Sequence, residues 1–259
     1  MRKEKKYKII ISVLALIIIF ETLFIIATRP KKVPRVPVVI KGKIAIVIDD
    51  WGYNLHNLAI LDQIKYPLTI SVLPNLNYSQ AINKELHKRG GFEIVLHLPL
   101  EPWEKFRLEK NTIMTSMDGQ TIRDIIVQDL ISVPGTKGVS NHMGSKATED
   151  LRTMEIIFRE LKRRHLYFLD SLVSSESVGF DLAHKMHILF ARRDVFLDNK
   201  EDPEYIKGQI HKLKTRARVY NQAIGIGHDQ KVTLEVLKEV MPELEKEGYK
   251  FVFVSELVK

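Results

Sequence analysis

Two adjacent carboxylates end an apolar, β-branched segment of this 259-residue chain: residues 44–50 read Ile-Ala-Ile-Val-Ile-Asp-Asp and lead into Trp51-Gly52. The segment is typical of a buried strand, and acids at its end carry a desolvation cost unless a cation lies beside them. Because successive strand residues face opposite sides, one acid can bind a metal ion while the other turns toward a pocket. Helix capping or a turn before Gly52 is the structural alternative.

Three histidines occupy comparable positions. His97 ends an apolar run, His142 lies in a polar segment flanked by glycines, and His228 follows two closely spaced glycines. The chain has no cysteine, so any metal must be bound by His, Asp, Glu and water. A neutral imidazole at a strand end suits a metal ion, and we expect this role for His97 and His142. His228 is expected to be a proton donor beside the site; for each histidine, a core residue bonded to backbone is the alternative.

Other polar residues lie near these positions. Asp170 closes a further apolar strand, and Arg192 lies close to the end of the next one. An aspartate and an arginine at neighbouring strand ends could orient a catalytic group electrostatically, or they could form a structural ion pair. Glu101 follows His97 by four residues and could orient a ligand, contact substrate or be solvated.

Four more residues are candidate substrate contacts. Asn141 and Ser145 flank His142 and could bind substrate or simply form the turn. Trp51 and Trp103 lie beside the two best motifs. Exposed at a cleft, a tryptophan could stack on the face of a sugar, whereas a buried one belongs to the core.

The net charge of +8 is unevenly distributed. Residues 1–43 hold 11 lysines and arginines against two acids, whereas residues 44–259 hold 29 against 30. The nearly neutral second part argues against a nucleic-acid-binding domain, so no nucleic acid is expected among the partners. The positive charge lies where a membrane-inserted chain carries it.

The N-terminal segment predicts export. Residues 9–27 contain 14 Ile, Leu, Val or Phe and one acid, Glu21. Those apolar residues contribute roughly −4 to −8 kcal/mol to insertion, and a central acid costs about 3 kcal/mol. A basic start before the span places the N-terminus in the cytoplasm and the remainder outside. A cleaved signal peptide is the alternative, although Ile25 and Ala27 make a poor small-x-small site.

We therefore expect a basic cytoplasmic segment at 1–8, a transmembrane signal-anchor at 9–28 and a linker at 29–42. The linker is rich in proline and lysine, which excludes helix and favours an extended spacer near the lipid surface. A single domain is expected at 43–259. It would be membrane-anchored and extracytoplasmic, in the periplasm or at the cell surface, and secreted if the N-terminal segment is cleaved.

Short apolar segments alternate with amphipathic ones from Lys43 onward. This pattern indicates a largely parallel sheet covered by helices, and an open doubly wound sheet or a closed or deformed barrel both fit it. In either, ligands bind at the carboxyl ends of the strands. The expected strands are 44–49, 68–73, 92–97, 138–141, 166–170, 187–191, 194–197, 223–227 and 250–254. The expected helices are 54–64, 78–90, 119–132, 149–164, 202–218 and 231–247.

Taken together, these motifs resemble the divergent polysaccharide deacetylase family, a distant branch of the polysaccharide deacetylases, over about residues 43–258. The segments that carry the resemblance are Ile48-Asp49-Asp50-Trp51-Gly52, His97-Leu98-Pro99-Leu100-Glu101, Asn141-His142-Met143-Gly144-Ser145, Leu169-Asp170-Ser171, Arg192 to Asp198, and Gly227-His228.

The resemblance implies an α/β fold, a deformed (β/α) barrel of about seven mainly parallel strands after one N-terminal transmembrane helix. It also implies a divalent metal, usually zinc, bound by one aspartate and two histidines. Carried over, Asp49 is the catalytic base, Asp50 is a metal ligand and His228 resembles the general acid. Ordinary polysaccharide deacetylases take both histidines from one His-x-x-x-His segment, whereas Glu101 stands four residues after His97 here. His142 is then the best candidate for the second histidine ligand.

The expected function is metal-assisted removal of an N- or O-acetyl group from an acetylated glycan or peptidoglycan-like polymer of the cell envelope. The departure at Glu101 motivates an alternative: a catalytically weak glycan-binding or envelope-interaction module that keeps the fold. A metal-dependent phosphoesterase is a third reading, disfavoured because no phosphate-binding glycine loop is present.

Overall fold

A computed structural model of the chain describes residues 2–28 and 40–259, which belong to two units, residues 1–38 and 39–259. In the first unit, α1 (Arg2–Thr28) contains a stretch, Glu4–Ile25, whose 22 residues are long and apolar enough to cross a membrane. A helix of this length spans about 33 Å, against about 30 Å for the hydrocarbon core. An anchor and the apolar part of a signal sequence both fit it. Of the predicted linker at 29–42, residues 29–39 lie outside the described part of the chain.

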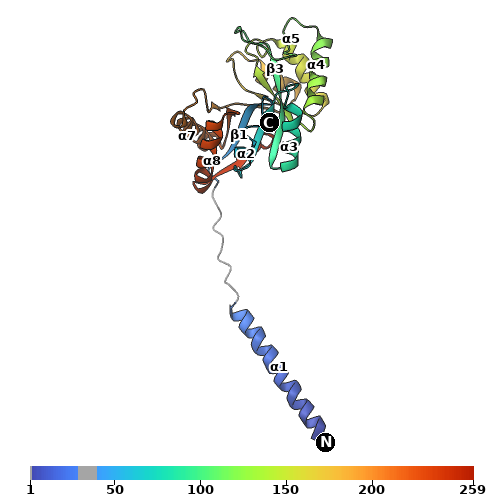
Figure 1. The fold of residues 1–259 in the computed structure, drawn as a ribbon, viewed down its shortest axis with the longest axis vertical. Coiled ribbons are helices and arrows are strands. Elements are labelled where there is room, and N and C mark those ends of the chain that lie inside the picture. The colour runs from blue at the N-terminus through green and yellow to red at the C-terminus, as the bar shows by residue number, and fades with distance from the viewer. Residues whose placement is uncertain (1, 29–39) are drawn as a thin grey trace. The chain divides into compact units, whose positions relative to one another are not determined.

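The second unit is built on one parallel sheet surrounded by helices (Figure 1). Its strand order is β6-β5-β4-β3-β2-β1-β8-β7, and β9 pairs with the start of β1. The strands are β1 (Gly42–Trp51), β2 (Leu68–Val72), β3 (Phe92–Leu100), β4 (Gly138–Met143), β5 (Tyr167–Asp170), β6 (Phe190–Arg192), β7 (Val195–Phe196), β8 (Gln222–His228) and β9 (Tyr249–Val252).

The two edges of this sheet must meet. β6 and β7 lie at opposite edges, yet only Arg193 and Asp194 separate them along the chain. Such a connection spans about 10 Å at most, so the sheet curls into a barrel. The junction is hydrogen-bonded on both sides: the Arg193 N–H donates to the Asp170 carbonyl at 2.9 Å, and the Asp194 N–H donates to the Ile224 carbonyl at 2.8 Å. The structure thus confirms the deformed (β/α) barrel.

Nine strand segments occur in residues 40–259, as the apolar pattern predicts, whereas the family resemblance implies a barrel of about seven. The difference arises because β6 and β7 share one position around the barrel, and β9 only extends the start of β1. The helices are α2 (Leu58–Leu61), α3 (Ser79–Arg89), α4 (Gly119–Ser132), α5 (Leu151–Arg163), α6 (Gly179–Met186), α7 (Pro203–Tyr220) and α8 (Lys231–Lys246), and one 3₁₀ turn follows at Val254–Glu256.

Two helix predictions need correction. The helix expected at 54–64 is a single turn, α2, because polar side chains there form other bonds: Asn54 Oδ1 accepts from the His56 N–H at 2.9 Å, and Asn57 Nδ2 donates to Asp229 Oδ1 at 2.8 Å. The short helix α6 was not predicted. Its eight residues lack the length over which a helical period becomes recognisable.

β1 divides the core into two layers. Ile44, Ile46 and Ile48 pack in the large cluster shared with the helices, whereas Ala45 and Val47 belong to a smaller cluster drawn from strands around the barrel. This alternation follows the two-residue period of a strand. By the same period, the next inward-facing residue of β1 is Asp49, at the carboxyl end of the barrel.

Candidate metal centre and active site

The end of β1 brings both of its acids to the same side. Asp50 has φ +67°, and the pairing of β1 with β2 shifts register between Ile48 and Trp51. A left-handed φ costs most L-residues roughly 1–2 kcal/mol, so the surrounding structure must offset the backbone strain of this bend. It takes the Asp50 side chain out of the strand alternation. As a result both acids face His97, whose Nε2 lies 3.7 Å from Asp49 Oδ2 and 3.2 Å from Asp50 Oδ1.

Asp50, His97 and His142 converge at this end of the barrel. Asp50 Oδ1 lies 3.0 Å from His142 Nδ1 as well as 3.2 Å from His97 Nε2, and one ligand atom of each residue lies within 4.8 Å of the others. The two imidazole rings cross at 69° with their centroids 5.0 Å apart. Pairing of β3 with β4 explains this approach, because it sets Pro99, two residues beyond His97, opposite His142.

This donor set fits a divalent cation. Asp50 Oδ1 and His142 Nε2 are buried without a hydrogen-bond partner, although nitrogen atoms lie close to the carboxylate. Ligands about 2.0–2.2 Å from a tetrahedral ion lie about 3.3–3.6 Å from one another, close to the spacing found around Asp50. Burial alone would raise the pKa of Asp50, but His142 and His97 outweigh burial and hold that pKa well below its usual range. The carboxylate is therefore ionised and able to act as a ligand.

Ser140 orients the buried imidazole of His97. Its Oγ lies 2.7 Å from His97 Nδ1, and the two residues are register partners on β3 and β4. With Nδ1 occupied in this way, Nε2 is the nitrogen that faces the two acids. Ser140 was not predicted as a site residue, because a serine within an apolar strand carries no signal without knowledge of the partner strand.

We expect Ser140→Ala to weaken metal affinity about 10- to 100-fold, the usual effect of removing a group that orients a metal-binding histidine. Competition with a chelator would measure the affinity. Ser132→Ala is a matched control, because it removes a buried hydroxyl on α4 that accepts from the Asn75 N–H at 2.9 Å. Equal affinities of the parent chain and Ser140→Ala would contradict this orienting role.

Asp49 has the surroundings of a general base. It is 2% exposed, and its Oδ1 is buried without a hydrogen-bond partner. Burial raises the pKa of this carboxyl above its ordinary value. A carboxylate with a raised pKa accepts a proton more readily than a solvated one. Asp49 is also the register partner of His228 on β8, which places the predicted base and the predicted acid on adjacent strands.

His228 is held by a buried carboxylate. Asp198 Oδ1 lies 2.8 Å from His228 Nδ1, and Asp198 Oδ2 accepts from the His228 N–H at 2.7 Å and from the Thr233 hydroxyl at 2.7 Å. Burial alone would lower the pKa of His228, but Asp198 outweighs burial and raises that pKa to about 9. The imidazole therefore carries a proton at neutral pH, as a proton donor must.

Asp198 is a site residue that the residue-by-residue reasoning missed. It belongs to the segment Arg192 to Asp198, which contributed to the family resemblance, but no role was assigned to it. The available signal was an acid that follows the short apolar strand β7 in the same way that Asp49 ends β1.

Asp170 and Arg192 take other places. Asp170 is buried, and its two oxygens accept from the Ser177 hydroxyl at 2.6 Å and the Leu172 N–H at 2.7 Å, which shapes the turn after β5. Arg192 is exposed, with its guanidinium 5.7 Å from the centre of the Phe180 ring. Within the described domain, neither residue forms a hydrogen bond to Asp49 or His228. A catalytic role for either one stays a prediction.

Two predicted substrate contacts are buried inside the structure. Trp51 is fully buried in the core, so the expectation that it stacks on a sugar is wrong. Glu101 has both oxygens in use: Oε2 accepts from the Thr115 N–H at 2.6 Å and hydroxyl at 2.7 Å, and Oε1 pairs with Lys146 Nζ at 2.7 Å. Glu101 thus fastens the loop that follows β3 and lies outside the ligand cluster.

The remaining three predicted contacts differ in exposure. Asn141 is buried and ties β4 to β5, because its Oδ1 accepts from the Ser171 N–H at 2.8 Å and its Nδ2 donates to the Met143 carbonyl at 2.8 Å. Ser145 Oγ accepts from the Trp103 N–H at 2.9 Å. Trp103 is 61% exposed, yet its indole Nε1–H is fixed by Glu149 at 2.9 Å. Of these three, Trp103 is the exposed one, and Lys146 Nζ lies 5.2 Å from the centre of its ring.

Comparison with known proteins identifies relatives along nearly the whole barrel. The model of the divergent polysaccharide deacetylase family matches residues 46–258. The uncharacterized protein YibQ of Escherichia coli is 34% identical over 206 residues, which cover 80% of this chain and 64% of that protein. An uncharacterized protein of Haemophilus influenzae is 31% identical over 198 residues, 76% of this chain and 70% of its own length. The chain thus spans slightly less than two thirds of the Escherichia coli relative.

Solved structures share the fold. An uncharacterized protein from Agrobacterium tumefaciens superposes with a TM-score of 0.80 at 23% identity, over 84% of this chain and 89% of that one. The catalytic domain of a peptidoglycan N-acetylglucosamine deacetylase from Eubacterium rectale gives 0.51 at 14% identity, over 82% and 88%. A mutant of a CE4 family pseudoenzyme gives 0.52 at 15% identity, over 85% and 68%. At such identities the likeness concerns the fold.

Proposed function

Because the chain belongs to the divergent polysaccharide deacetylase family, we propose that it is a metal-dependent hydrolase that removes N- or O-acetyl groups from an envelope polysaccharide. One observation carries this proposal. Asp50, His97 and His142 converge from three strands, beside Asp49 and the Asp198–His228 pair. A ligand set next to one buried acid and one protonated imidazole matches the needs of acyl transfer to water.

The proposed ligands are Asp50, His97 and His142. Bound there, a divalent metal, which we propose to be zinc, supplies Lewis acidity toward the acyl carbonyl and the attacking water. Two histidines and one carboxylate would hold the ion as in other catalytic sites, which keep a position for water or substrate.

The side chains of this protein move the protons. Asp49 takes a proton from the attacking water as the new C–O bond forms. His228 donates its proton to the sugar nitrogen as the C–N bond breaks, which releases acetate and leaves an amine on the glycan. Asp198 keeps the imidazole oriented and protonated for this step. The raised pKa of Asp49 favours its work as a base near neutral pH.

Trp103 is our proposed sugar-stacking residue. Its exposed ring is held by Glu149 and lies 5.2 Å from Lys146 Nζ, so little side-chain freedom is lost when a ligand binds. Ser145 supports this position through the Trp103 backbone. We propose an acetylated glycan or peptidoglycan-like polymer as the partner of this face.

The direct experiment is acetate release from N-acetylglucosamine oligomers by the full chain after chelation and stepwise return of zinc, cobalt or magnesium. Activity that rises to a plateau at one equivalent of metal supports the proposal. Stoichiometric metal without acetate release from N- or O-acetylated oligomers would argue against a hydrolase.

The pH profile offers a separate prediction for Asp198→Asn. Since His228 must be protonated to act, the rate of the parent chain should fall as the pH rises through about 9, the pKa of His228. Asp198 is the main group that raises this pKa, so its loss lowers the pKa of His228 and should move the alkaline fall in rate to lower pH. Asp202→Asn, which removes a carboxylate charge at the start of α7 and keeps an acceptor for the Tyr205 N–H, should leave the limb in place. An unshifted limb in Asp198→Asn would exclude His228 as the acid.

We further propose that α1 anchors the domain in a membrane, with the barrel on the extracytoplasmic side. Basic residues precede the apolar stretch, and such charge remains on the cytoplasmic side during insertion. Fractionation of cells with a protease-accessibility assay would test this orientation. A domain protected from external protease in intact spheroplasts would contradict it.

A catalytically weak glycan-binding module is the second candidate. Its motivation is the replacement of the second histidine of the usual His-x-x-x-His segment by Glu101, which is bonded to Lys146. This candidate predicts glycan binding that survives Asp49→Asn and no acetate release from the parent chain.

A further inference from the structure

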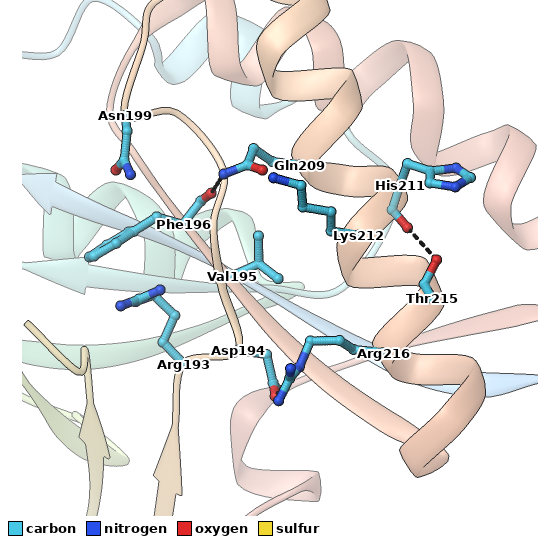
Figure 2. A pocket seen from close by; sticks show the side chains of 10 residues that line it. All are labelled: Arg193, Asp194, Val195, Phe196, Asn199, Gln209, His211, Lys212, Thr215 and Arg216. Carbon is cyan, nitrogen blue, oxygen red and sulfur yellow. Dashed lines mark hydrogen bonds and ion pairs between the residues drawn. The ribbon is translucent and has the colours of Figure 1, made fainter. Parts of the chain in front are cut away.

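A groove of about 580 Å³ lies between the β6–β7 junction and α7 (Figure 2). Lys212 extends from α7 toward Phe196 and Asn199 on the opposite wall, and Arg193 lies beside Phe196 (Figure 2). The groove is open to solvent and is distinct from the three-residue ligand cluster. Neither the family resemblance nor the proposed mechanism assigns a role to it.

The groove carries unbalanced positive charge. Its one carboxylate, Asp194, is already used: Oδ2 accepts from the Ile224 N–H at 2.9 Å and Oδ1 from Arg216 Nε at 3.0 Å. Arg193 is held by two neutral acceptors, the Ser171 carbonyl at 2.7 Å and the Leu172 carbonyl at 2.8 Å. Within residues 40–259, neither Arg193 nor Lys212 forms an ion pair. Arg193 and Lys212 thus line the groove without a direct ion pair, and Asp170, Asp194 and Asp49 act on Arg193 only over a longer distance.

The groove begins beside the proposed proton donor. The Arg193 guanidinium lies 3.6 Å from the centre of the Phe196 ring, and that ring stacks on His228 with centroids 5.9 Å apart and planes inclined by 19°. His228 is proposed to protonate the nitrogen that stays on the sugar. The sugar that carries this nitrogen must therefore lie near His228. The adjacent sugar of the glycan then lies next to the groove.

We propose that this groove binds an anionic substituent, a carboxylate or phosphate, on the sugar next to the one that is deacetylated. The substrate is then an acidic N-acetylated glycan. This identification of the glycan rests on the proposed function. Arg193 Nη1, which forms no hydrogen bond within residues 40–259, and the flexible ammonium of Lys212 in the same groove suit both kinds of anion. Charge in a groove beside a reacting centre also concentrates an oppositely charged substrate there.

The test compares three probes on the full chain in an uncharged detergent. The first is a neutral N-acetylglucosamine tetramer, the second a tetrasaccharide alternating glucuronic acid and N-acetylglucosamine, and the third an N-acetylglucosamine tetramer with a 6-phosphate. At least one acidic probe should bind about tenfold more tightly than the neutral one at low salt, and this advantage should shrink as added salt shortens the Debye length. The two acidic probes separate carboxylate from phosphate.

Lys212→Gln should weaken the acidic probe about three- to tenfold and leave the neutral probe unchanged, as expected for loss of one charge-assisted contact. Arg218→Gln is the matched control. It removes one charge from an exposed position of the same helix outside the groove, and it should change neither affinity.

Equal affinity for all three probes, or an equal loss for neutral and acidic probes in Lys212→Gln, would overturn the inference. If the neutral tetramer is deacetylated and acidic probes show no preference, the groove assignment fails while the proposed function stands. If acidic probes bind through Lys212 and no probe releases acetate, the anion site stands and the hydrolase proposal fails. Absence of binding by every probe counts against both.

Discussion

Asp50→Ala is expected to abolish stoichiometric metal binding and to lower acetate release by more than about 100-fold, because loss of a ligand should exceed the 10- to 100-fold effect of losing a group that only orients one. Asp50 is the carboxylate whose Oδ1 lies within 3.2 Å of both imidazoles, so its substitution removes the one acid of the ligand cluster and leaves only the two imidazoles to hold a dication. Metal content after dialysis, measured by plasma mass spectrometry, and the acetate assay check the two parts separately.

Glu101→Gln is the matched control for Asp50→Ala. Both changes remove a carboxylate from the carboxyl end of the barrel, and Glu101 occupies the position where ordinary polysaccharide deacetylases have their second histidine. In this protein its oxygens are taken by Thr115 and Lys146, so metal stoichiometry should be unchanged. Metal loss in Glu101→Gln with retention in Asp50→Ala would reverse the proposed ligand set and reject His142 as its third member.

Asp49→Asn is expected to lower kcat about 10²- to 10⁴-fold, the range for loss of a positioned general base. The change keeps the size of a side chain that is 2% exposed, so folding should be preserved. Asp49 lies 3.7 Å from His97 Nε2, farther than Asp50, and it is not a member of the ligand cluster. Metal binding and glycan affinity should therefore remain near those of the parent chain.

This variant also separates the two candidate functions. A hydrolase loses turnover and keeps binding, whereas a binding module shows the same glycan affinity and no acetate release before and after the change. Parental turnover in Asp49→Asn would remove Asp49 from the mechanism and leave the base unassigned. Thermal unfolding of both chains with metal present would confirm that folding is unchanged.

Much of the barrel was predictable because its strands are short, apolar and parallel. The apolar runs ending near Asp49, His97, Asp170 and His228 were recognised as strands from composition alone. Parallel strands place all of their carboxyl ends at one rim, so polar residues at those ends had to become neighbours. The same reasoning failed for 54–64, where side-chain bonds compete with helix, and for α6, which is too short to show a period.

The candidate site was predictable as a set of positions and less so as a set of roles. Asp50, His97 and His142 meet as expected, and the family resemblance added that His142 is the best candidate for the second histidine ligand. Trp51 was misjudged because its neighbours along the chain are a turn and two acids, whereas its neighbours in space are core side chains.

By itself, the sequence determined a largely parallel α/β sheet covered by helices, the apolar N-terminal helix and the rim at which acids and histidines gather. The family resemblance implied that this sheet closes into a barrel, and the β6–β7 junction shows it. Only the tertiary structure decided which of those side chains face one another. The left-handed φ of Asp50, the pairing of Ser140 with His97 and the capture of His228 by Asp198 each depend on one backbone angle or on register between strands distant in sequence. A shift of one residue turns every side chain of a strand to its other face, and local sequence does not encode the partner strand that fixes that register.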